Sequence, residues 1–295
     1  MNSRRLIRFI CHICAPYWFL LPALAIYIAF MTYPLIDSFV ISLHKWDGLS
    51  SDWTFIGFKN YIRFFKDPIS LSALKNNLIW IVFILAIPIS LGLTLASILN
   101  RKITGRTIFR SIFYSPAVFP LVSVGIIWVW IYNPTFGALN EFLRIIRLSS
   151  LTHGWLAERQ TALYCVIITA IWQSTGFSMI LFLAGLQGIP KELYEAAQLD
   201  GAGSFKCFRY ITIPLLQEMF IIVACLLIAT SLKIFDLVYI MTWGGPARST
   251  QVLATWMYFN TFLYHNAGYG SAIAFIMACI VLLITYPYVR LMSRR

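Results

Sequence analysis

Long apolar stretches alternate with short polar segments along the chain. A helix needs roughly 20 mostly apolar residues to cross a bilayer. Six stretches meet this requirement, and they cover 16–36, 77–99, 111–132, 162–187, 217–241 and 269–290. The pattern predicts an all-α, polytopic membrane protein with six transmembrane helices.

The first apolar run follows a basic segment that contains Arg4, Arg5 and Arg8. The run is too long for a cleaved signal peptide, and no small-residue cleavage site follows it, so it is predicted to be a retained first helix. We therefore expect residues 1–15 to form a cytoplasmic N-terminus. Residues 16–295 would form one six-span domain, with a core at about 73–287.

Composition and charge agree with a membrane protein. The chain is 60% hydrophobic and 12% charged, whereas soluble domains average about 25% charged residues. The net charge is +12, but the basic residues flank the apolar stretches, where they set topology and meet anionic lipid. Nucleic acid is therefore not an expected partner. The short 100–110 segment carries four basic residues, which places it and both termini in the cytoplasm.

The sequence lacks the motifs of common catalytic and metal sites. No Gly-Lys pair occurs, so a phosphate-binding loop of the G-x-x-x-x-G-K-[ST] type is excluded. The histidines form no H-E-x-x-H motif, and Cys11 and Cys14 form a C-x-x-C without a second pair. We expect a transport protein and no enzyme, with no metal and no cofactor bound by this chain.

One polar stretch interrupts the apolar pattern, "PKELYEAAQLDGAGSFKCFRYITIPLL" at 190–216. Pro190 suits the first turn of a helix, and Gly201 suits a left-handed stop at its end. Ser204 can begin a second short helix that Pro214 closes. Leu193, Ala196 and Ala197 share one small apolar face. The pattern favours a hairpin that docks on a cytoplasmic partner over one that lies on lipid.

The same stretch resembles the EAA loop of ABC-importer permeases. The residues that carry the resemblance are Glu195, Ala196, Ala197, Asp200, Gly201, Ala202, Ile211 and Pro214. "FIGFKNY" (55–61) and "FDLVYIMTWGGPARST" (235–250) resemble the sugar-importer branch of the maltose and glycerol-phosphate type. "FIGFKNY" is similar to the first member of the permease pair in that branch. The resemblance to this family extends from about residue 15 to about residue 290.

The resemblance implies a fold, a function and a set of partners. The fold would be that of a type I ABC importer, and the 188–213 loop would couple to an ATP-hydrolysing subunit through Glu195 to Ala202. The partners would be a second, homologous permease, two ATP-binding subunits that hold ATP and Mg, and an extracytoplasmic solute-binding protein. The complex would import a carbohydrate across a prokaryotic cell membrane.

Two polar interruptions in the apolar stretches are candidates for the substrate pathway. Trp172, Gln173 and Ser174 interrupt the fourth stretch and offer an aromatic ring, an amide and a hydroxyl to a sugar. The fifth contains Ser231, Lys233 and Asp236, whose two charges we expect to form a structural pair on one helix face or to line a wet pathway. The resemblance to maltose permeases places sugar contacts at Ala170, Gln173, Ser174, Leu227, Ser231 and Ile234. Several of these are apolar, which argues against maltose.

Several alternatives stay open. An ion-coupled secondary transporter would also use several spans and an intramembrane Asp, and a permease of this family could carry a non-sugar solute such as glycerol-3-phosphate. A membrane enzyme would need a catalytic cluster, which we do not find. The aromatic-rich segment 37–75 suits either the membrane interface or a partner surface.

Overall fold

The computed structural model describes residues 19–101 and 103–292, and nearly all of its regular structure is helical. The elements, in chain order, are η1 (Ile28–Thr32), α2 (Tyr33–Ser42), β1 (His44–Lys45), β2 (Thr54–Phe55), α3 (Lys59–Lys66), α4 (Pro68–Leu99), α5 (Arg106–Val118), α6 (Leu121–Ile131), α7 (Ala138–Ile145), η2 (Ser149–Leu151), α8 (Ala162–Gln187), α9 (Lys191–Leu199), α10 (Ser204–Cys207), η3 (Phe208–Thr212), α11 (Ile213–Leu215), α12 (Gln217–Leu232), α13 (Asp236–Thr242), α14 (Leu253–Tyr258), η4 (Phe259–Leu263) and α15 (Ala267–Met292). The predicted N-terminal segment 1–15, with Cys11 and Cys14, lies outside the described residues.

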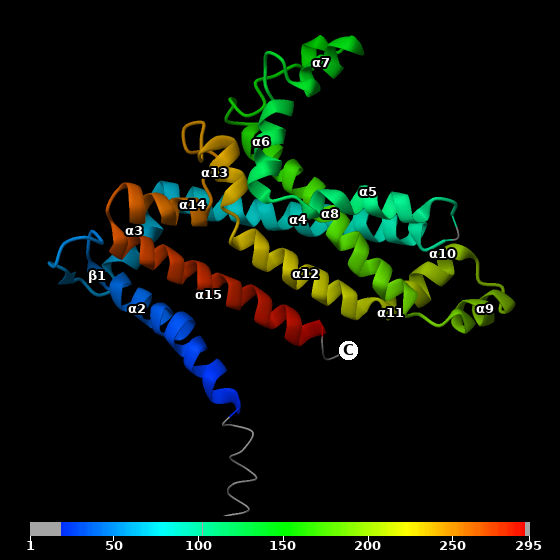
Figure 1. The fold of residues 1–295 in the computed structure, drawn as a ribbon, viewed down its shortest axis with the longest axis horizontal. Coiled ribbons are helices and arrows are strands. Elements are labelled where there is room, and N and C mark those ends of the chain that lie inside the picture. The colour runs from blue at the N-terminus through cyan, green and yellow to red at the C-terminus, as the bar shows by residue number, and fades with distance from the viewer. Residues whose placement is uncertain (1–18, 102, 293–295) are drawn as a thin grey trace, which may run out of the picture.

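Helix α8 is the centre of the bundle and packs against α4, α5 and α12 (Figure 1). Glycines allow these helices to approach closely. A Cβ atom on Gly92 of α4 would lie 2.7 Å from Cβ of Ser178. A Cβ atom on Gly176 of α8 would collide with the carbonyl oxygen of Phe113 in α5. Large residues at these two glycines would push the helices apart.

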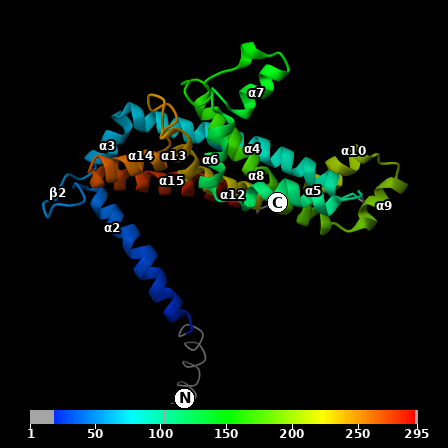
Figure 2. The same cartoon turned by 45° about the horizontal axis from the view of Figure 1, so that its top comes forward.

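Helix α2 leaves the bundle as it runs toward the N-terminus, and α7 stands apart from the bundle at another edge (Figure 2). The first span, Phe19–Ser42, has none of its apolar window buried in this chain. Its apolar side chains, among them Phe19 and Phe30 at 86% and 75% exposure, are therefore free to face lipid or another protein.

Within residues 19–101 and 103–292, four helices are each long and apolar enough to cross a membrane, and the number rises to as many as six if each of two bent helix pairs counts as one span. The six-span prediction is compatible with this result. The predicted stretch 162–187 coincides with α8, and 269–290 falls within α15. Helix α4 begins earlier than predicted, at Pro68, because the Asp67 side chain accepts a hydrogen bond from the Ile69 N–H and caps the helix.

Two of the predicted spans are wrong as continuous helices. The 111–132 stretch breaks between α5 and α6, which meet at 99°. Pro120 has no N–H for a helix and forces Phe119 into an extended conformation (ψ 139°). The 217–241 stretch also breaks, because α12 ends at Leu232 and α13 begins at Asp236. Both breaks lie at the cavity described below.

Hydrogen bonds join helices at the end of the bundle that carries the β1–β2 hairpin. The Asp67 carboxylate accepts hydrogen bonds from Ser70 (2.7 Å), Tyr269 (3.0 Å) and the indole N–H of Trp256 (3.1 Å). Burial raises the pKa of the Asp67 carboxyl, but these bonds and the one from the Ile69 N–H outweigh it, so the pKa lies below its ordinary value. One carboxylate thus ties α4, α14 and α15 together.

Candidate functional site

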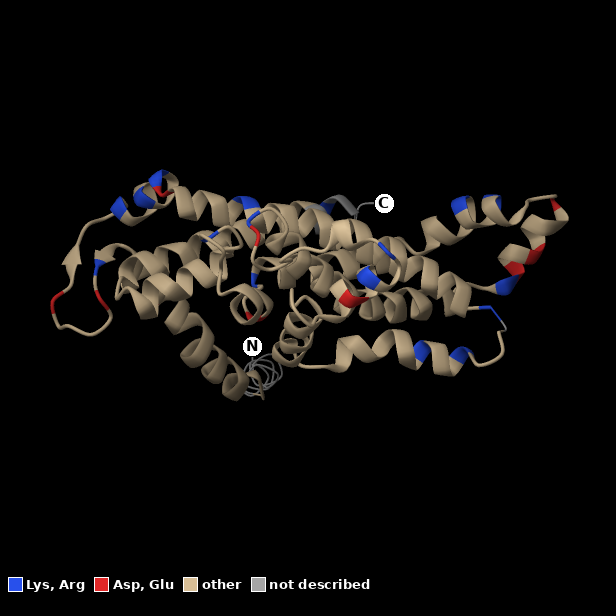
Figure 3. Ribbon diagram, turned by 90° about the horizontal axis from the view of Figure 1, so that it is seen from above, with Lys and Arg blue, Asp and Glu red and all other residues tan. Residues whose placement is uncertain are grey.

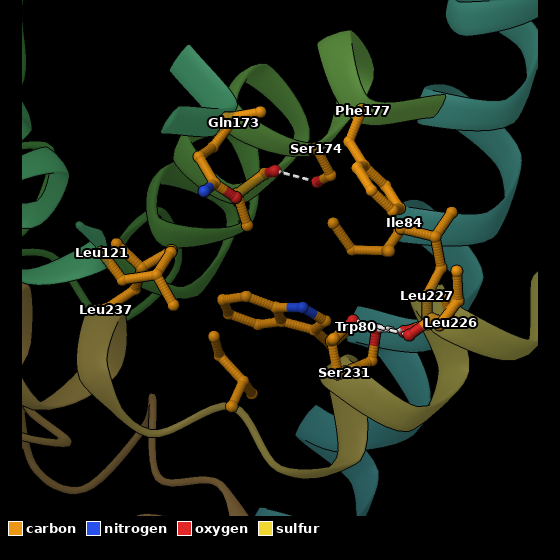
Figure 4. Close-up of a pocket in the computed structure, with 14 residues that line it drawn as sticks. Trp80, Ile84, Leu121, Gln173, Ser174, Phe177, Leu226, Leu227, Ser231 and Leu237 are labelled. Carbon is orange, nitrogen blue, oxygen red and sulfur yellow. Dashed lines mark hydrogen bonds between the residues drawn. The ribbon is translucent and has the colours of Figure 1, made fainter. Parts of the chain in front are cut away.

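A cavity of about 280 Å³ lies where the two helix breaks meet the centre of the bundle (Figure 4). It is lined by α4, α5, α6, α8, α12, α13 and the segment between the last two. The lining residues are Trp80, Ile84, Ala117, Leu121, Ala170, Gln173, Ser174, Phe177, Leu226, Leu227, Thr230, Ser231, Ile234 and Leu237. Irregular backbone at membrane depth is tolerated where it is buried in protein or lines a cavity, and both breaks satisfy this condition.

The six contact positions that the family resemblance placed in the sequence all line this cavity. Gln173, Ser174 and Ser231 are among them, so the structure brings together these three predicted pathway residues from α8 and α12. Trp80 and Phe177 line the cavity but could not be predicted, because in an apolar stretch they are indistinguishable from core aromatics. Ala117 and Leu121 were also not predicted, because they reach the cavity only through the bend between α5 and α6.

Three of the predicted pathway residues do not line the cavity. Trp172 is 41% exposed and packs edge-on against Trp128 of α6, with ring centroids 5.6 Å apart. Lys233 and Asp236 do not share a helix face, because Lys233 caps the end of α12 and Asp236 begins α13. The described part of the chain contains no ion pair between them. The predicted structural pair is therefore wrong.

We expect the effects of Lys233→Met and Asp236→Leu on membrane abundance to multiply in the double variant, because no ion pair couples the two side chains. Quantitative immunoblots of membranes from the two single variants and the double variant measure this. A double variant that is more abundant than either single variant would instead indicate a buried pair, since breaking such a pair typically costs about 3–5 kcal/mol.

The hydroxyl groups in the cavity already donate hydrogen bonds to helix carbonyls. Ser231 Oγ donates to the Leu227 carbonyl (2.6 Å), Thr230 Oγ1 donates to the Leu226 carbonyl (3.0 Å), and Ser174 Oγ donates to the Ala170 carbonyl. These oxygens keep lone pairs with which they can accept from a ligand. No charged side chain is among the lining residues. The cavity thus offers neutral hydrogen-bonding groups in a largely apolar wall.

A buried amide holds the backbone beside the cavity. The Asn77 side chain of α4 donates to the Ser231 carbonyl (3.0 Å) and accepts from the Leu253 N–H (2.8 Å). The Ser231 carbonyl lies in the last turn of α12, where helix carbonyls lack intrahelical partners. Asn77 therefore stabilises the break that follows Ser231 and joins it to α14.

The predicted coupling residues form a hairpin at one end of the bundle, beside the α4–α5 turn (Figure 1). Lys and Arg lie on both of these turns, Asp and Glu also lie on the hairpin, and both kinds of charge recur at the opposite end of the bundle (Figure 3). Helix α9 carries Glu195, Ala196 and Ala197, and the first two of these are exposed. Helix α10 follows a short turn, so the predicted helix–turn–helix is confirmed. The chain bends by 64° after Leu215 and not at Pro214, which lies inside α11.

The turn of the hairpin is a Schellman motif centred on Gly201, whose φ is +77°. The Gly201 N–H donates to the Gln198 carbonyl (3.0 Å), and the Ala202 N–H donates to the Ala197 carbonyl (2.8 Å). Asp200 is the C-cap of α9. Leu199 and Phe205, on either side of the turn, are 90% and 78% exposed. Such exposed apolar side chains beside the turn are typical of a docking surface.

The arrangement of helices, cavity and hairpin is shared with known proteins. Residues 86–294 match the family described as "Binding-protein-dependent transport system inner membrane component". "Probable ABC transporter permease protein YurN" of Bacillus subtilis is 38% identical, over 90% of this chain and 92% of that protein. "Trehalose/maltose transport system permease protein MalF" of Thermococcus litoralis is 32% identical, over 93% and 92%.

The fold also matches a solved structure. A chain of a bacterial alginate ABC transporter, solved in complex with an alginate pentasaccharide-bound periplasmic protein, superposes with a TM-score of 0.85. The match covers 98% of each chain at 23% identity. The predicted ABC-importer permease fold is therefore confirmed.

Proposed function

This chain belongs to the family of inner membrane components of binding-protein-dependent transport systems, and from that premise we propose that it passes a neutral carbohydrate through the membrane. The family makes it a transport subunit and favours a permease over an ion-coupled secondary transporter. The observation that carries the proposal is the cavity wall, which combines an indole, an amide and hydroxyls with no charged side chain. Sugars present hydroxyl rims and apolar C–H faces that suit such a wall.

The same wall argues against the alternative cargo, glycerol-3-phosphate. Arg and Lys side chains commonly bind phosphate in proteins, and the cavity lining contains no cationic side chain. An acidic polysaccharide such as the alginate of the structural relative is disfavoured for the same reason. The trehalose/maltose system named for the Thermococcus relative supports a neutral sugar as the cargo class.

The proposal includes the partners and the coupling route. The 188–213 loop would dock on one of two ATP-binding subunits through Glu195 to Ala202, and ATP and Mg would reside on those subunits. A second, homologous permease would complete the pathway, and an extracytoplasmic solute-binding protein would deliver the cargo. Residues 16–295 would form the membrane domain, with the core at about 73–287. Both termini would lie in the cytoplasm, in agreement with the basic 100–110 segment beside the hairpin.

Purification of the tagged chain from its native membrane tests this set of partners. We expect a second permease and a P-loop ATPase to co-purify. In proteoliposomes with these chains and the binding protein, ATP should drive uptake of a neutral mono- or disaccharide but not of glycerol-3-phosphate. Uptake of glycerol-3-phosphate, or uptake that follows an ion gradient without ATP, would contradict the proposal.

Gln173→Ala is expected to raise the KM for uptake about three- to tenfold. The Gln173 amide lines the cavity and makes no hydrogen bond to the described chain, so it can bond to the cargo, and a lost hydrogen bond costs roughly 0.5–1.5 kcal/mol. Ser231→Ala should have a smaller effect, since its hydroxyl proton is already donated to Leu227. Gln187→Ala, at the exposed end of the same helix, is the control. Equal uptake by Gln173→Ala and wild type would place the pathway elsewhere.

A further inference from the structure

Trp80 of α4 is a buried core residue that also lines the cavity, so packing alone does not account for a Trp at this position. The side chain is 1% exposed and yet lines the cavity. In the view of Figure 4 its indole ring lies between Ser231 on one side and Gln173 and Ser174 on the other. The ring therefore reaches the space between α8 and α12, which hold the remaining polar groups of the wall.

The indole N–H of Trp80 has no hydrogen-bond acceptor within the described part of the chain. The N–H of a buried Trp usually finds a partner. Asn77, one turn earlier on α4, could have supplied an acceptor, but its carbonyl oxygen is taken by the Leu253 N–H. A donor that faces a cavity without a protein acceptor is suited to a ligand.

Few other groups in the cavity can donate a hydrogen bond to a ligand. The hydroxyls of Ser174, Thr230 and Ser231 donate to helix carbonyls, so toward a ligand they mainly accept. The donors left for a ligand are the Gln173 amide and the Trp80 indole N–H. Gln173 can rotate to present either its NH₂ or its oxygen, whereas an indole is a donor only. The Trp80 N–H can therefore bond only to a hydrogen-bond acceptor of the ligand, and only at one fixed place.

We propose that Trp80 is a specificity-determining residue of the transport cavity, whose indole N–H donates a hydrogen bond to one hydroxyl or ring oxygen of a neutral sugar. This assignment rests on the proposed function. The assignment adds to that function the requirement for an acceptor oxygen at one position of the cargo. A site that is built to hydrogen-bond a hydroxyl discriminates against the analogue that lacks it, because the buried donor is then left without a partner.

The test uses the complete transporter in proteoliposomes with its binding protein and ATP. The probe is whichever of glucose, maltose and trehalose wild type takes up best, together with the monodeoxy analogues of that sugar. We expect Trp80→Phe to raise the KM for the parent sugar about three- to tenfold, the effect of one hydrogen bond. One deoxy analogue should be discriminated against by wild type and no longer by Trp80→Phe.

Two further variants keep the outcome decisive. Trp128→Phe is the matched control. The Trp128 N–H likewise lacks a partner among the described residues, but Trp128 does not line the cavity, so this variant should keep wild-type discrimination. Trp80→Tyr retains a ring with a donor and should keep part of the discrimination even if Trp80→Phe assembles poorly.

The two proposals fail in different ways. Discrimination by Trp80→Phe equal to that of wild type at every deoxy position would overturn the assignment of Trp80 alone. Absence of ATP-driven uptake of any neutral sugar by the wild-type complex would overturn the proposed function, and the Trp80 assignment with it.

Discussion

Gly201→Val is expected to abolish ATP-driven uptake while the protein remains in the membrane. Gly201 has a φ of +77°, a conformation that costs an L-residue roughly 1–2 kcal/mol and a β-branched one more. A Cβ atom at Gly201 would meet no other atom within 4 Å, so the effect comes from backbone strain and not from a collision. The strained turn should release the two Schellman hydrogen bonds and reorient α9 relative to α10.

The transmembrane helices pack without help from this turn, so membrane abundance should stay near wild type. ATP-driven uptake in proteoliposomes and retention of the ATPase in a pull-down measure the expected loss. Gly203→Val is the matched control, because Gly203 lies two residues away, has an extended backbone (φ −72°, ψ 166°) and likewise has open space around it. Equal uptake by the two variants would show that the turn has no part in coupling.

The sequence alone predicts the elements whose ends are marked by local chemistry. Helix α8 is bounded as predicted because its apolar run ends at polar residues on both sides. The hairpin after it is predicted because Gly201 supplies a left-handed turn and Ser204 starts the next helix. Both features depend on neighbouring residues, and these can be read along the chain.

The helix breaks could not be predicted from neighbouring residues in this way, because each depends on partners far away in the sequence. Pro120 is a local signal for the first break, but a proline can also be accommodated inside a helix, as Pro88 is in α4. The second break has no proline or glycine between Ser231 and Asp236. It depends on Asn77, about 150 positions earlier, whose amide satisfies the Ser231 carbonyl. The role of Trp80 could not be predicted for a related reason, since nothing in its own segment shows that it faces a cavity.

Asn77→Leu should destabilise the protein and lower uptake, because it leaves both the Ser231 carbonyl and the Leu253 N–H buried without their partner. Each such group costs about 1–3 kcal/mol, so the total would be about 2–6 kcal/mol. Asn77 is 0% exposed, so water cannot replace the amide without rearrangement of α4 against α12.

The apparent melting temperature of the purified protein in detergent and the membrane abundance report the loss of stability, and the KM of the surviving protein reports displacement of Ser231. Asn100→Leu is the control, since Asn100 is exposed at the far end of the same helix and should behave as wild type. If Asn77→Leu melted at the wild-type temperature, the break between α12 and α13 would be stabilised by its own apolar packing. The buried residues Leu232 and Leu237, both at 0% exposure, would then be the next side chains to shorten.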